Sequence, residues 1–171
     1  MRTTIRSMIT AEGCIIAMDD GTITWTPRRG GLKRVRLDAQ ASVILGLIGP
    51  KGKIDRVVIG DISGAVNIIS LSQMAVIDRY VTGKSKVRSL CSSSISGECI
   101  LVGCENGSIY LVGQNVPDRV VELFELDGPA SAMRVVGQSL HIQQGWKRLT
   151  LDWTGEEVGN RSKKKGSLIL A

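Results

Sequence analysis

Few residues of this sequence have the types and spacing that catalysis requires. A core or interface position is the ordinary role of an isolated histidine such as His141, because a general base also needs a positioned partner. The carboxylates Asp19, Asp20 and Asp61 lie near glycines, where acidic residues commonly form turns. No Walker-type loop, GxSxG or HExxH motif is present. We predict a non-enzymatic protein with no catalytic residue and no cofactor, because the sequence offers no identifiable nucleophile or base.

The cysteines do not have the spacing of a metal site. Cys14, Cys91, Cys99 and Cys104 form no CxxC pair and have no matching histidine at a zinc-like distance along the chain. They lie in apolar segments of a chain without an export signal, so we expect free buried thiols rather than disulfides, and no bound metal.

Charge gives the stronger indication of binding chemistry. The chain has 22 Lys and Arg against 16 Asp and Glu, a net charge of +6, which favours anionic partners. Such clusters can form a solvated rim that keeps an edge strand from pairing, or can contact the phosphates of nucleic acid or another polyanion. Interleaved aromatic residues, which would stack on single-stranded bases, are absent. The basic residues form two clusters, Arg28, Arg29, Lys33, Arg34 and Arg36, and near the C-terminus Arg161, Lys163, Lys164 and Lys165.

An internal repeat indicates the elements that must position these residues. The turn glycines Gly21, Gly64 and Gly107 are 43 residues apart, and Gly145 follows after 38. In the first three repeats the preceding residue is Asp, Ser or Asn, and apolar runs lie on both sides, as expected for two-residue β-hairpins in which polar residues and glycine adopt positive φ.

Two further strands are expected in most repeats. An inner strand recurs upstream at Ile5–Met8, Val43–Leu45, Val87–Leu90 and Met133–Val136, and an outer strand recurs downstream at Leu32–Leu37, Ala75–Val81 and Val120–Leu126. Four antiparallel strands in about 43 residues are typical of a β-propeller blade, whose two faces pack on neighbouring blades. We therefore predict an all-β fold, a β-propeller of about four blades.

Two segments resemble a known group of repeats. Residues 60–68, GDISGAVNI, and 103–111, GCENGSIYL, are similar to the turn between the second and third strands of WD40 and quinoprotein-like repeats. The similarity runs from Thr4 to about Thr154. The Gly-His and Trp-Asp pairs of a typical WD40 repeat are missing, and near the Trp position only Trp25 is found, followed by Thr26.

The repeats give expected boundaries for the domain. The four blades are placed at about 1–40, 41–84, 85–128 and 129–155, a basic polar linker at 156–166, and an outer strand or tail at 167–171. Four blades of this length leave two apolar faces open, so we expect two chains to form an eight-bladed ring. A closed four-bladed monomer and a ring completed by another half-propeller are the alternatives.

Three arginines recur near the start of the inner strands. Arg6, Arg88 and Arg134 would face the central channel of a propeller and attract an anionic ligand, unless they pair with carboxylates between blades.

The sequence thus favours a propeller scaffold that binds a protein partner on its ring face. A nucleic-acid or polyanion-binding module that uses the basic residues is the alternative. Without an apolar signal segment or a membrane span, the expected location is the cytoplasm, with no membrane partner.

Overall fold

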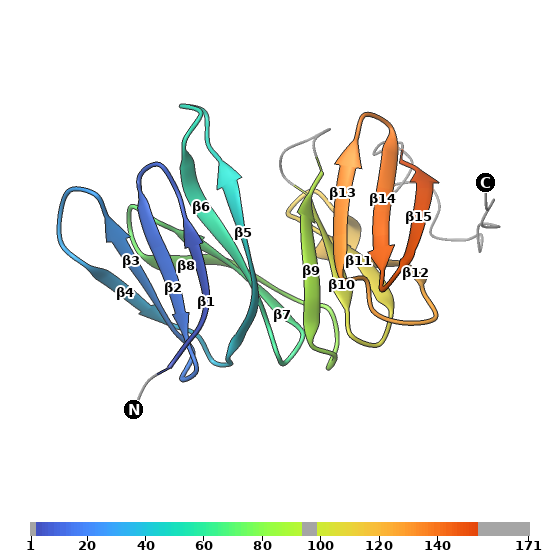
Figure 1. The fold of residues 1–171 in the computed structure, drawn as a ribbon, viewed down its shortest axis with the longest axis horizontal. Helices are drawn as coiled ribbons and strands as arrows, with labels where there is room; N and C mark the ends of the chain where they lie inside the picture. The colour runs from blue at the N-terminus through green and yellow to red at the C-terminus, as the bar shows by residue number, and fades with distance from the viewer. Residues whose placement is uncertain (1–2, 94–98, 154–171) are drawn as a thin grey trace. The chain divides into compact units, whose positions relative to one another are not determined.

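The structure, a computed structural model, describes residues 3–93 and 99–153. Within these ranges every regular element is a β-strand except one short 3₁₀ turn, η1 (Pro117–Arg119), so the predicted all-β class is confirmed. The chain divides into two compact units, Met1–Val87 and Arg88–Ala171. Each unit contains two antiparallel sheets in which strands that follow one another along the chain are neighbours (Figure 1).

The first unit holds two four-stranded sheets. The first sheet consists of β1 (Thr4–Ile9), β2 (Gly13–Met18), β3 (Thr22–Pro27) and β4 (Lys33–Arg36). The second sheet consists of β5 (Ala41–Ile48), β6 (Ile54–Asp61), β7 (Ala65–Ser70) and β8 (Ala75–Val81).

The second unit holds one sheet of four strands and one of three. The third sheet consists of β9 (Val87–Ser92), which starts at the boundary between the units, β10 (Ile100–Cys104), β11 (Ser108–Val112) and β12 (Val120–Glu125). The fourth sheet consists of β13 (Ala132–Val136), β14 (Ser139–Gln144) and β15 (Lys147–Asp152). The predicted inner and outer strands are confirmed. The basic linker at 156–166, with its charge cluster, and the segment 167–171 lie outside the described residues.

Alternation along the strands builds the core of the first unit. Ile15 and Ala17 of β2 and Ile23 and Trp25 of β3 point to the same face of the first sheet, because Ile15 pairs with Trp25 and Ala17 with Ile23. These four side chains form one buried cluster with residues of the second sheet, Val57, Ile59, Ile69 and Leu71. Because the residues of β6 from Val57 to Asp61 are all buried, this strand is covered on both faces, which explains its continuous apolar run.

The hairpin turns between the second and third strands are one residue longer than predicted. Gly21, Gly64 and Gly107 have φ of 81°, 90° and 98°, but the Asp, Ser and Asn before them do not adopt positive φ. Each glycine N–H donates to the carbonyl oxygen three residues back, as in a type I turn that ends in a left-handed glycine. The carbonyl oxygen of each glycine then accepts the N–H of the residue that follows the outer strand, Leu37, Thr82 or Leu126.

A cation-rimmed groove in the first unit

A groove of about 660 Å³ lies at one edge of the first two sheets. One side is formed by the β1–β2 turn and the loop between β3 and β4, and the other side by the β5–β6 hairpin and the β7–β8 turn. Its volume falls in the range of small-ligand and peptide-anchor pockets, roughly 300–1,000 Å³.

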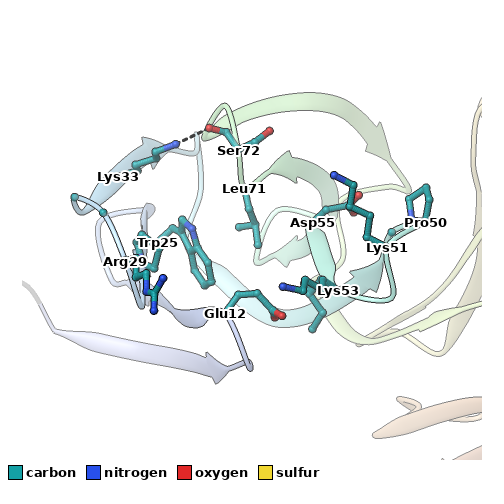
Figure 2. A pocket seen from close by; sticks show the side chains of 15 residues that line it. Glu12, Trp25, Arg29, Lys33, Pro50, Lys51, Lys53, Asp55, Leu71 and Ser72 are labelled. Carbon is teal, nitrogen blue, oxygen red and sulfur yellow. Dashed lines mark hydrogen bonds between the residues drawn. The ribbon is translucent and has the colours of Figure 1, made fainter.

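The floor of the groove is apolar. Trp25 and Leu71 are 6% and 4% exposed and belong to the buried cluster between the sheets, and Ile54 packs against that cluster. Figure 2 shows the Trp25 ring and the Leu71 side chain pointing into the groove. Gly13 makes room for the ring, because a Cβ atom at this position would lie 2.7 Å from Trp25 Cη2 and 2.3 Å from the Thr26 carbonyl oxygen.

The rim of the groove carries four cations from two distant segments. Arg29 and Lys33 lie on one side, and Lys51 and Lys53 on the other (Figure 2). Lys33 Nζ donates to the Ser72 carbonyl oxygen at 2.6 Å and so connects the two sides. Within residues 3–93 and 99–153, no ion pair is found for Arg29, Lys51 or Lys53.

Two carboxylates also line the groove. The Asp55 carboxylate lies close to Gly49 and 3.4 Å from Arg56 Nε, so its negative charge is partly offset by the Arg56 guanidinium. Glu12 belongs to the β1–β2 turn, where its N–H donates to Thr10 Oγ1 and its carbonyl oxygen accepts the Arg28 N–H. With four cations against two carboxylates, the groove presents a positive rim.

The basic cluster predicted at 28–36 divides between different surfaces. Lys33 pairs with Trp25 across the strands and lines the groove, together with Arg29. Arg34 and Arg36 pair with Thr24 and Thr22 and therefore point to the opposite face of the first sheet. Arg28 is exposed outside the groove lining. Lys51 and Lys53 were not predicted as site residues, although the GPKGK segment at 49–53 indicates a tight basic turn.

The three inner-strand arginines occupy similar positions but different environments. Arg6 lies opposite Ala17, and its guanidinium donates to the carbonyl oxygens of Ser42 and Ile5, each at 2.8 Å. Arg88 lies 3.9 Å from Glu105, and Arg134 lies opposite His141. Since Arg6 belongs to the first unit and the other two to the second, an anion-binding ring of these residues stays a prediction.

Outside the groove, the side chains of His141 and Asp61, which could take part in acid–base chemistry, form hydrogen bonds with neighbouring residues. His141 Nδ1 lies 3.2 Å from Thr150 Oγ1, across the β14–β15 pair. The buried Asp61 carboxylate accepts hydrogen bonds from the Ser63 and Ala65 backbone N–H groups, the Ser63 hydroxyl and the Asn67 amide, and so stabilises the turn. These four hydrogen bonds use most of the acceptor capacity of the carboxylate.

The four cysteines are free thiols, as predicted, but Cys14 and Cys99 are only partly buried. Cys91 and Cys104 are buried, and burial raises the pKa of the Cys91 thiol, which reduces its thiolate fraction and its nucleophilicity. In the described part of the chain, no group of three or more His, Cys, Asp or Glu side chains has the arrangement of a metal site. The same residues include no helix long and apolar enough to span a membrane.

Solved structures with this fold resemble the chain at low sequence identity. Saccharomyces cerevisiae Sqt1 matches with a TM-score of 0.72 and 16% identity over 87% of this chain and 45% of its own. The computationally designed Ika4 protein matches with a TM-score of 0.68 and 13% identity over 85% of this chain and 88% of its own. A chain of the mitotic checkpoint complex matches with a TM-score of 0.68 and 10% identity over 88% of this chain and 52% of its own. This chain thus spans about half the length of Sqt1 and of the matched chain in the mitotic checkpoint complex.

No protein-family model matches the sequence, and no curated protein does. Structural similarity at this level of identity establishes the fold, which is a WD40-like β-propeller fold, as the repeats predicted. The function has to be inferred from the groove and the charges.

Proposed function

We propose that the chain is a non-enzymatic propeller module that binds a protein partner. The observation that carries this proposal is the groove of the first unit, which combines a buried apolar floor with a cationic rim. Binding sites for proteins need an apolar anchor site surrounded by polar groups, and this groove supplies both.

We further propose that two chains close one ring. Propeller sheets bury both faces against neighbours, whereas Ile16 and Met18, on the face of the first sheet directed away from the second, are only partly buried. The match to Sqt1 uses 45% of that chain, as expected if this chain corresponds to about half of a larger ring. Light scattering should then give twice 18.4 kDa in both low and high salt, and a monomer in both would overturn dimeric closure.

Salt dependence separates protein binding from polyanion binding. The exposed cations at Arg28, Arg29, Lys33, Arg34 and Arg36 make a polyanion the alternative partner. Binding through phosphate contacts loses about 10³- to 10⁵-fold in affinity between roughly 50 and 200 mM salt.

The experiment is isolation of the affinity-tagged full chain from its source cells without crosslinking, followed by washes at increasing salt. A stoichiometric protein that stays bound through the high-salt wash would support the proposal. Co-isolation of nucleic acid alone, lost over the range above, would overturn it in favour of the polyanion module.

A further inference from the structure

We propose that the groove binds an acidic peptide segment of the partner, with one apolar side chain seated against Trp25, Leu71 and Ile54. This inference rests on the proposed protein-binding function and adds the chemistry of the recognised segment.

The floor determines what kind of side chain can dock. Trp25 and Leu71 expose only a small fraction of their surface, so they offer a narrow apolar contact rather than an open aromatic platform. A nucleic-acid base needs an exposed ring face on which to stack, which Trp25 at 6% exposure does not provide. A leucine, methionine or phenylalanine side chain would make an apolar contact here and release water.

The rim determines the charge of the segment. Three of the four rim cations, Arg29, Lys51 and Lys53, have no ion pair in the described residues, and the fourth, Lys33, keeps its charge while it donates to Ser72. Carboxylates on both sides of the apolar anchor would meet Arg29 and Lys33 on one wall and Lys51 and Lys53 on the other (Figure 2). Clusters of cations around a pocket are one of the recurring ways in which proteins recognise acidic motifs.

The lysines of the second wall are presented by an ordered turn. The Gly49 N–H donates to the Lys53 carbonyl oxygen at 2.8 Å, and the Gly52 N–H donates to the Gly49 carbonyl oxygen at 3.0 Å. Gly52 has φ of 70°, a left-handed conformation that favours glycine. Because the backbone is fixed, binding orders the lysine side chains but not the loop, which lowers the entropic penalty of association.

The experiment is selection of a random-peptide phage library on the full chain, followed by fluorescence anisotropy with the most enriched peptide. We expect enriched sequences to place two or more Asp or Glu around one large apolar residue. The double substitution Lys51→Glu and Lys53→Glu, or Arg29→Glu alone, should weaken binding of this peptide at least about tenfold. Replacing the apolar residue of the peptide with alanine should weaken binding by a similar factor, which tests the floor without disturbing the fold of the protein.

The matched control is the single substitution Lys84→Glu. It changes the net charge as much as Arg29→Glu does, but the exposed Lys84 follows β8 beside the Gly64 turn, at the end of the second sheet away from the groove. Affinity within about twofold of the original supports local recognition, whereas equal losses in Lys84→Glu and Arg29→Glu would show a long-range field effect and overturn the proposal.

Two other results would also overturn it: enrichment of neutral or basic peptides, or no enrichment at all. If a partner protein nevertheless stays bound through the high-salt wash, the propeller module still binds protein, and only the assignment of the groove fails.

Discussion

The first sheet, in the first unit, and the third sheet, in the second unit, use the loop after the third strand in opposite ways. In the first sheet, the loop from Arg28 to Leu32 is exposed throughout, and Leu32 is 51% exposed. In the third sheet, the corresponding loop between β11 and β12 turns inward at Val116, just before η1, and Val116 is 6% exposed in a cluster with Leu111 and Trp153. One loop leaves space beside the core, and the other fills such space with its own side chain.

The hairpins between first and second strands show the same contrast. The β5–β6 hairpin extends through Gly49-Pro50-Lys51-Gly52-Lys53 and adds two cations to the groove, whereas β13 and β14 are joined by the two residues Gly137 and Gln138. A repeated strand framework therefore does not produce repeated sites. The loops, which can be lengthened without disturbing the sheets, decide where a surface is available for binding.

Introducing a charge into each loop should give the largest difference in the free energy of unfolding between variants of the two units. Val116→Asp would place a carboxylate in an apolar cluster without a partner and should lower the free energy of unfolding by about 3 kcal/mol or more. Leu32→Asp is the matched control on the exposed loop and should change it by less than about 0.5 kcal/mol. Urea denaturation of both variants measures the difference, and equal losses would show that the two loops are packed alike.

The sequence predicted the strands of both units but not this difference between their loops. Strand positions follow from glycine-containing turns and apolar runs that recur with fixed spacing, so Gly21, Gly64 and Gly107 were sufficient to align the sheets. The inward Val116 is followed by a turn with positive φ at Asp118 and Arg119, which no local pattern of the sequence specifies. Packing of two sheets brings Arg29 and Lys53 to opposite sides of one groove, and the spacing of a repeat does not predict that such distant segments will line the same site.

The two faces of β4, by contrast, can be predicted from the sequence. Alternation of side chains along a strand places Lys33 and Val35 on one face and Arg34 and Arg36 on the other. A count of charges over residues 28–36 gives a single basic cluster along the chain, and the structure divides its β4 members between two faces. The two-residue period of a strand separates the same cations into two groups, and only one of these groups lies at the groove.

Replacing turn glycines should have an intermediate effect on stability. It also tests whether the turn of the fourth sheet is packed like that of the third. A Cβ atom at Gly107 would lie 2.3 Å from the Leu126 carbonyl oxygen, and φ there is 98°, so Gly107→Ala should destabilise the protein by about 2–3 kcal/mol. Gly145 occupies the same hairpin in the fourth sheet with φ of 57° and no atom within 4 Å of a Cβ, so Gly145→Ala should cost only about 1 kcal/mol.

Thermal or urea unfolding of the two variants ranks these costs. We expect Gly107→Ala to be the more destabilising change, because the Gly107 turn in the third sheet packs against Leu126, the residue that follows the outer strand β12. The Gly145 turn has no such neighbour among the described residues. A Gly145→Ala variant as unstable as Gly107→Ala would mean that an outer strand also covers the fourth turn.

The smallest effect on stability is expected at the charged pair of Asp127 and Lys147, beside the Gly145 turn. Hydrogen bonds from Gln144 and from Lys147, whose Nζ lies 3.3 Å from the Asp127 carboxylate, hold the pKa of Asp127 below its ordinary value. A lowered pKa in the folded state contributes stability above the unfolded pKa, and this contribution is lost as pH falls through the folded pKa. Asp127 is exposed, so screening by solvent and salt keeps the contribution small.

Gln144→Ala should raise the pKa of Asp127, because it removes the largest single cause of the lowered pKa. Lys147→Ala should also raise this pKa, because it removes both a hydrogen bond and a nearby positive charge. Carboxyl ¹³C chemical shifts followed from about pH 2 to 7 report this pKa directly. No change in either variant would mean that the pair forms no lasting contact, and that the exposed turn of the second unit is held by its backbone alone.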